Sequence, residues 1–160
     1  MLDEKDRAPR FRRCVFLLLG CLALRGAVAG VTSPEELARS GSQVVWLDFW
    51  ASWCTPCRHS FPWMNAMQRK YGARGFKVLA VNLDSDHKDA DRFLATVPAE
   101  VTVDFDPEGI LAKQYGVEAM PSSYLLDRTG HVVARHMGFK ESKEAEYEAA
   151  IRAALGLPES

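Results

Sequence analysis

The sequence predicts an α/β fold, with a mixed central sheet and helices on both of its faces. Two observations support this prediction. Apolar runs at residues 44–50 and 76–83 are typical of buried strands, and a helical stretch at residues 55–71 separates them. A strand–helix–strand unit needs a crossover and implies parallel pairing. By contrast, residues 122–126 and 131–136 lie close enough in the chain to form an antiparallel hairpin.

The remaining elements follow from helix boundary signals and short apolar segments. Ser33-Pro34-Glu35-Glu36 supplies an N-cap residue, a proline at the first helical position and an acidic first turn, so a short helix is expected here. Gly72 and Gly75 end the long helix. We further expect a short strand at 101–103, a hairpin turn at 127–130, and helices at 86–96, 107–115 and 142–155.

Charge is unevenly placed along the 160-residue chain, whose formal net charge is −1. Residues 1–29 hold six basic and three acidic residues, which leaves 14 basic and 18 acidic residues, and a net charge of −4, in the remainder. A nucleic-acid partner requires a clustered basic face. We therefore expect no nucleic-acid partner.

Residues 1–29 resemble an export signal. Basic residues precede an apolar stretch of eleven residues, and Ala27-Val28-Ala29 forms a small-x-small cleavage site. Leu18-Leu19-Gly20-Cys21 offers an alternative, a bacterial lipoprotein box in which Cys21 would be lipidated. A third alternative is an uncleaved anchor, although the apolar stretch is too short to span a bilayer as a free helix. We expect a single domain at 30–160, located in the bacterial periplasm and either soluble or lipid-anchored.

The most specific chemical signal is Cys54-Thr55-Pro56-Cys57, which joins a predicted strand to a predicted helix. A helix N-terminus presents unpaired N–H groups and the positive end of the helix dipole, and both favour a thiolate. Such a position lowers the pKa of a cysteine from about 8.5 into a range of roughly 3.5–7.5. Cys54 is therefore the expected nucleophile, and Cys57 would then attack the mixed disulfide. If cleavage follows Ala29, no other thiol remains, which favours disulfide exchange over a structural disulfide framework.

Half of a zinc site is the alternative interpretation of this cysteine pair. Zinc needs two further ligands, usually a second close Cys/His pair. His131 and His136 are five residues apart in a predicted hairpin and would face opposite sheet surfaces. The acidic residues at 84, 86, 89 and 91 are better explained as the polar start of a helix. We predict neither a metal nor an organic cofactor, only a redox-active Cys54–Cys57 disulfide.

The segment from Asp48 to Cys57 closely resembles the active-site segment of thioredoxins. Later segments resemble the exported branch of that superfamily, the TlpA/ResA-like thiol–disulfide oxidoreductases. These segments are Arg58-His59-Ser60-Phe61-Pro62, Val81-Asn82-Leu83-Asp84, Asp106-Pro107-Glu108-Gly109, Tyr115-Gly116-Val117 and the run from Met120 to Gly130. The resemblance covers about residues 42–155 and implies a thioredoxin fold.

The resemblance implies a role for Asp48, the polar residue in an otherwise apolar strand. In thioredoxins the matching aspartate lies beneath the resolving cysteine and is assigned a proton-transfer role. Asp48 would accordingly deprotonate Cys57. The alternative is an aspartate at the end of a strand that faces solvent.

Met120-Pro121 matches the cis-proline site of the family. An X–Pro bond adopts the cis form at little cost, and the backbone before the proline pairs with substrate like an added strand. Met120 and Pro121 are therefore expected to bind substrate. The alternative is an ordinary trans proline at the start of a strand.

Three residues beside the cysteines complete the predicted substrate site. Trp53 directly precedes Cys54 and is the best candidate for substrate contact, whereas Trp50 is expected in the core. Thr55 and Pro56 lie between the cysteines, where we expect them to face substrate and to tune the reduction potential.

These observations predict an exported thiol–disulfide oxidoreductase that reduces periplasmic protein disulfides, with cytochrome c or copper-site maturation as more specific options. The resemblance implies a membrane electron donor of the DsbD/CcdA type as a partner, and a membrane tether at the N-terminus stays open. One alternative is a copper-binding chaperone, which typically spaces its cysteines by three residues. Another is a peroxiredoxin-like peroxidase, which has a threonine where this chain has Ala51. The direction of electron flow depends on a reduction potential that the sequence does not reveal.

Overall fold

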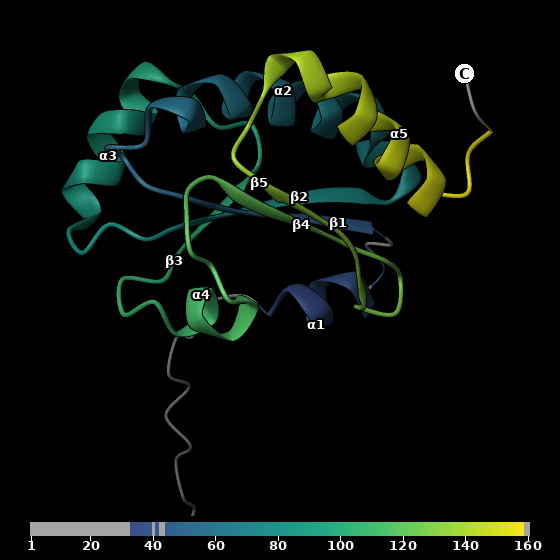
Figure 1. Ribbon diagram of the computed structural model, residues 1–160, viewed down its shortest axis with the longest axis horizontal. Helices are drawn as coiled ribbons and strands as arrows, with labels where there is room; N and C mark the ends of the chain where they lie inside the picture. The colour runs from purple at the N-terminus through teal and green to yellow at the C-terminus, as the bar shows by residue number, and fades with distance from the viewer. Residues whose placement is uncertain (1–32, 40, 42–43, 159–160) are drawn as a thin grey trace, which may run out of the picture.

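A computed structural model describes residues 33–39, 41 and 44–158 of the chain (Figure 1). Its strands are β1 (Val44–Trp50), β2 (Phe76–Asn82), β3 (Thr102–Phe105), β4 (Ser122–Leu126) and β5 (Val132–Met137). They form one sheet in the order β3-β2-β1-β4-β5. β2 pairs in parallel with β1 and with β3, whereas β4 pairs antiparallel with β1 and with β5. The expected mixed sheet is confirmed.

Five α-helices connect and cover these strands: α1 (Pro34–Arg39), α2 (Thr55–Tyr71), α3 (His87–Thr96), α4 (Ile110–Tyr115) and α5 (Glu144–Ala154). Two short 3₁₀ turns, η1 (Gly72–Arg74) and η2 (Glu141–Lys143), follow α2 and precede α5. Among the described residues, no helix is both long and apolar enough to cross a membrane. The predicted export signal at 1–29 lies outside the described residues.

The predicted boundary of α4 is wrong by three residues, and the reason is local. The helix starts at Ile110 and not at 107, because Asp106 accepts hydrogen bonds from the backbone N–H groups of Ile110 (2.8 Å) and Ala112 (2.9 Å). Gly109 precedes the helix with φ +65°, a left-handed conformation that glycine adopts without steric cost. Residues 106–109 therefore form a turn that leads into the helix.

The two faces of the sheet bury different apolar clusters, because successive residues of a strand point to opposite faces. Figure 1 shows α2, α3 and α5 on one side of the sheet and α1 and α4 on the other. β1 supplies Val44, Trp46 and Trp50 to the first cluster, and Val45, Leu47 and Phe49 to the second. Asp48 shares the alternation of Trp46 and Trp50, so it faces the layer that contains α2.

Candidate redox-active site

The Cys54–Cys57 disulfide lies at the N-terminus of α2, directly after the loop that leaves β1. Cys54 is the N-cap residue, and its Sγ accepts a hydrogen bond from the backbone N–H of Cys57 at 3.2 Å. Cys54 is 4% exposed and Cys57 is fully buried. When the pair is reduced, the same N–H group and the positive end of the helix dipole would stabilise a thiolate on Cys54.

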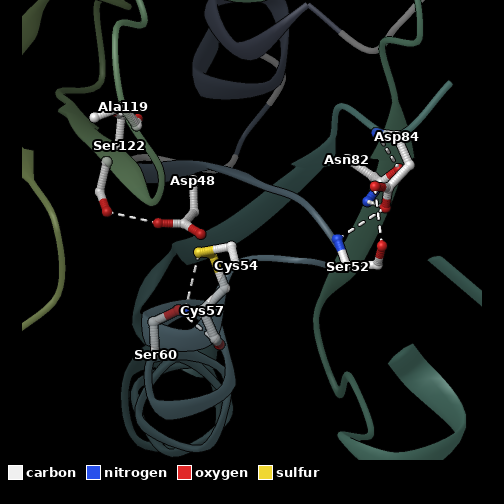
Figure 2. The surroundings of a disulfide bond; sticks show 10 residues. Asp48, Ser52, Cys54, Cys57, Ser60, Asn82, Asp84, Ala119 and Ser122 are labelled. Carbon is white, nitrogen blue, oxygen red and sulfur yellow. Dashed lines mark hydrogen bonds between the residues drawn. A yellow bond between two sulfur atoms is a disulfide. The ribbon is translucent and has the colours of Figure 1, made fainter. Parts of the chain in front are cut away.

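Asp48 is fully buried in β1, with Trp46 and Trp50 on the same face of the strand. One carboxylate oxygen, Oδ1, accepts a hydrogen bond from the hydroxyl of Ser123 at 2.6 Å, while Oδ2 is buried and has no hydrogen-bond partner among the described residues. Figure 2 shows the carboxylate directed at the disulfide. The alternative of a solvent-facing aspartate at the strand end is therefore wrong.

Burial raises the pKa of the Asp48 carboxyl to about 7, because desolvation penalises its charged form. The hydrogen bond from Ser123 opposes this shift, since it stabilises the carboxylate. A pKa near neutrality allows a carboxylate to both accept and release a proton at physiological pH. The site thus combines a disulfide at a helix N-terminus with a buried carboxylate that faces it.

A second carboxylate anchors the loop that carries the disulfide. Asp84 follows β2 and is 7% exposed. It accepts hydrogen bonds from the backbone N–H of Ser52 (2.9 Å), the hydroxyl of Ser52 (3.0 Å) and the side-chain amide of Asn82 (2.8 Å). Figure 2 shows these three residues beside the segment that leads into Cys54.

The assignment of Asp84 to a polar helix start is therefore wrong, although it holds for Asp86, which caps α3. The signal for this contact was the Asn82-x-Asp84 pair at the carboxyl end of a parallel strand. The partnership of Ser123 with Asp48 was also missed, because it depends on how β1 and β4 are aligned.

The Met120–Pro121 peptide bond is cis, as the sequence predicts, so the trans alternative is wrong. Met120 packs, partly buried, against the apolar cluster that includes both cysteines. The carbonyl of Pro121 accepts a hydrogen bond from the backbone N–H of Gly138 at 2.8 Å, which ties the loop before β4 to the end of β5.

The surface around the disulfide is partly apolar. Trp53 is 71% exposed, and Thr55 and Pro56 are exposed as well. A hollow of about 300 Å³ next to them is lined by Thr55, Pro56, His59, Phe139 and Glu141. Trp50 is fully buried and belongs to the core, as expected. The exposed indole of Trp53 therefore gives the surface beside the disulfide an apolar part.

The described part of the chain contains no cluster of three or more His, Cys, Asp or Glu side chains arranged to hold a metal ion. His136 is half-buried in β5, where its ring stacks on Trp46 with a centroid distance of 5.4 Å. His131 is exposed and precedes β5. The two histidines thus lie in different surroundings, and neither joins the cysteines in a cluster of that kind.

The chain is similar in sequence to one protein family and to several named relatives. The redoxin family matches residues 4–151. The thiol-disulfide oxidoreductase ResA of Bacillus thuringiensis subsp. konkukian is 31% identical over 111 residues, which cover 69% of this chain and 64% of ResA. The thioredoxin-like protein YneN of Bacillus subtilis is 36% identical over 115 residues, covering 70% of this chain and 66% of YneN. The chain thus spans somewhat less than two thirds of the length of the ResA relative.

Solved structures agree with the sequence comparison. A protein described as a DsbE-type thiol:disulfide interchange protein from Chlorobium tepidum is 58% identical, with a TM-score of 0.71, and the match covers 72% of this chain and 82% of that one. This similarity confirms the thioredoxin fold. The chain therefore belongs to the redoxin family, and within that family it stands with the ResA- and DsbE-like thiol-disulfide oxidoreductases.

Proposed function

We propose that this protein is an exported thiol–disulfide oxidoreductase that reduces disulfides in other proteins. One observation carries the proposal: a Cys54–Cys57 disulfide at a helix N-terminus lies above a buried carboxylate that points at it. A structural disulfide needs neither a proton acceptor nor a helix dipole. A disulfide that is made and broken in each cycle uses both.

The reaction starts from the reduced protein. The thiolate of Cys54 attacks one sulfur of a substrate disulfide, forms a mixed disulfide with it and expels the other sulfur as a thiolate. Asp48 then takes the proton of Cys57, whose thiolate attacks the sulfur of Cys54. This step forms the Cys54–Cys57 bond and releases the second substrate thiolate, so the substrate gains two electrons. Two protons, one of them from Asp48, complete the substrate thiols.

Substrate recognition is assigned to the surface beside Cys54. The indole of Trp53 offers an apolar contact, and Thr55 and Pro56 border the same face. By the resemblance to the family, the backbone of Met120 next to Pro121 pairs with an extended segment of the substrate. Main-chain pairing is independent of side-chain identity, so such a site would accept several different proteins.

The location and partners follow from the N-terminal sequence and from a relative. Residues 1–29 carry the features of an export signal. The exposed lipoprotein thioredoxin Etrx1 of Streptococcus pneumoniae is 28% identical, and the match covers 90% of that chain with a TM-score of 0.62. We accordingly place this protein in the periplasm, soluble or lipid-anchored through Cys21. A dithiol donor of the DsbD/CcdA type would return it to the reduced state, and cytochrome c or copper-site proteins are candidate substrates.

The test is the reduction of insulin by dithiothreitol, in a Cys14→Ser/Cys21→Ser background so that only Cys54 and Cys57 remain. We expect that background to be active, Cys54→Ser to be inactive, and Cys57→Ser to accumulate a mixed disulfide with the substrate. Activity that survives in Cys54→Ser would refute the reductase function. Equilibration with glutathione gives the reduction potential, and a strongly oxidising value would reverse the proposed direction. Hydrogen peroxide and Cu(I) added in parallel test the peroxidase and chaperone alternatives.

A further inference from the structure

Two serines that follow each other at the start of β4 make different contacts. Ser123 lies directly opposite Asp48 in the antiparallel register of β1 and β4. It is 5% exposed, and its hydroxyl donates to Oδ1 of Asp48 at 2.6 Å. The hydroxyl of Ser122 instead donates to the carbonyl of Ala119 at 2.6 Å. Only Ser123 therefore reaches the proposed proton acceptor.

The contact with Ser123 distinguishes the two oxygens of Asp48. Oδ1 is occupied, whereas Oδ2 is buried and has no hydrogen-bond partner within the described residues. Without this bond the carboxylate could rotate about its last side-chain bond, which is a soft torsion. With the bond in place, the free oxygen has a defined direction, and the carboxylate faces the disulfide (Figure 2).

The neighbours of Asp48 itself are apolar, so no other side chain replaces Ser123 easily. The titratable His136 lies opposite Ser123 on β5, on the far side of β4 from Asp48. On the same face of β1, Asp48 is flanked by Trp46 and Trp50, whose buried indole nitrogens have no hydrogen-bond partner in the described part of the chain. Across β2 the residue in register with Asp48 is Ala80. Ser123 is thus the one residue in register beside Asp48 that carries a hydroxyl, and it supplies the hydrogen bond that the carboxylate receives.

We propose that Ser123 is a positioning residue for disulfide exchange: its hydroxyl holds Oδ1 of Asp48, so that Oδ2 is the oxygen that receives the proton of Cys57. This inference rests on the proposed function, in which Asp48 is the acceptor. It also has an electrostatic consequence. A hydrogen bond to a carboxylate stabilises the charged form, so loss of the Ser123 hydroxyl raises the pKa of Asp48 further.

The first test titrates Asp48 in the oxidised full-length protein, where the disulfide keeps Cys54 and Cys57 from titrating. The side-chain carboxyl carbon is followed by ¹³C NMR. A hydrogen bond to a charged group is strong enough to change a pKa by about one, so Ser123→Ala should move the midpoint upward by about that amount. Ser123→Thr keeps a hydroxyl and should titrate like the wild type. Ser122→Ala removes an identical group from the adjacent position and should also leave the midpoint unchanged.

The second test follows the step that the proposal assigns to Asp48. Reduced protein in the Cys14→Ser/Cys21→Ser background is mixed with oxidised glutathione, and release of the second glutathione thiol reports resolution by Cys57. We expect Ser123→Ala to move the pH profile of this step upward by the same interval as the midpoint. If that interval is about one on the pH scale, the step becomes about tenfold slower on the acidic side. The limb of the profile in which the rate rises with pH is the one that titration of Asp48 would cause. Asp48→Asn should remove this limb, and Asp48→Asn/Ser123→Ala should behave as Asp48→Asn alone.

The outcomes distinguish the acceptor role of Asp48 from the positioning role of Ser123. If Asp48→Asn keeps the limb, Asp48 is not the acceptor and the proposed mechanism fails. If Asp48→Asn removes the limb while Ser123→Ala changes neither the titration nor the profile, the positioning role of Ser123 is refuted and the acceptor role stands. An equally large change in Ser122→Ala would show general loosening of β4, and would also refute the positioning role.

Discussion

At the scale of single residues, Asp48 links the chemistry of the site to the stability of the fold. Its pKa is raised from 3.8 to about 7 in the folded protein, chiefly by burial. The folded state therefore holds a proton that the unfolded state releases between these two values. Stability is fully present below pH 3.8 and is lost as the pH rises toward 7. The carboxylate that is useful in exchange thus weakens the fold at neutral pH.

We expect Asp48→Asn to be more stable than the wild type at pH 8. A pKa raised by this much corresponds to about 4 kcal/mol, which the wild type loses on going from acid to alkaline pH and the variant does not. Unfolding of the oxidised proteins by urea at pH 4 and pH 8 measures the difference. The gain should be small at pH 4, where the native carboxyl is protonated as well. An equal difference at both pH values would contradict the raised pKa.

At the scale of elements, the site is fixed by the connection between β2 and α3 as well as by the redox helix. Asp84 accepts three hydrogen bonds, two of them from Ser52 in the loop that leads to Cys54. The backbone N–H of Leu83 also donates to the carbonyl of Trp50 at 2.9 Å. The ends of two neighbouring parallel strands are thereby joined just ahead of the nucleophile. We infer that this contact limits the freedom of Cys54 relative to α2.

Asp84→Ala should weaken the fold and slow the attack by Cys54. The change leaves two donors of Ser52 and one of Asn82 without their acceptor, and the cost should be on the order of 3 kcal/mol. Asp86→Ala is the matched control, because it removes a carboxylate from the same connection, where Asp86 caps α3. It should cost about 1 kcal/mol and leave the rate with a small disulfide unchanged. Denaturation curves and that rate distinguish the two variants, and equal rates in both would argue against a role for Asp84 in positioning the loop.

At the scale of the whole molecule, the two faces of the sheet differ in content, because the redox site lies on one face only. The face covered by α2, α3 and α5 holds the disulfide, Asp48 and its flanking tryptophans, whereas α1 and α4 cover an apolar cluster that lacks both cysteines (Figure 1). β1 contributes to both clusters, so its seven residues are all buried. Asp48 consequently points from β1 toward the layer that contains α2, while the apolar cluster on the opposite face packs against the same strand.

How far the sequence predicts this arrangement depends on the range of the interactions. Strand β1 and helix α2 were predicted with their observed bounds, because apolar runs and caps are local signals. The short strand expected at 101–103 is present, but its bounds are wrong, because β3 spans Thr102–Phe105 and these bounds are set by pairing with β2. The contact between Ser123 and Asp48 spans 75 positions and depends on strand register, which no local pattern encodes. Proximity of Asp48 to the cysteines was predictable only through resemblance to a family.

A second titratable group, the half-buried His136, acts on stability in the direction opposite to that of Asp48. His136 lies opposite Ser123 in the register of β4 and β5, and its ring contacts the rings of Trp46 and Tyr147. Its Nε2 is buried and has no hydrogen-bond partner among the described residues. Burial lowers the pKa of His136. The unfolded chain therefore takes up a proton near pH 6.5 that the folded protein resists, and stability is lost as the pH falls below that value. As the pH falls below 6.5, His136 therefore lowers the stability of the fold while Asp48 raises it.

His136→Phe should unmask the contribution of Asp48. Phenylalanine keeps the aromatic contacts with Trp46 and Tyr147 but cannot be protonated. Relative to the wild type, the variant should gain stability progressively as the pH falls from 7 to 5, because the proton uptake by unfolded histidine is removed. Urea unfolding of the oxidised wild type and the oxidised variant across this range measures the difference in stability. A stability difference that stays constant with pH in His136→Phe would mean that the half-buried ring contributes through packing alone and does not oppose Asp48.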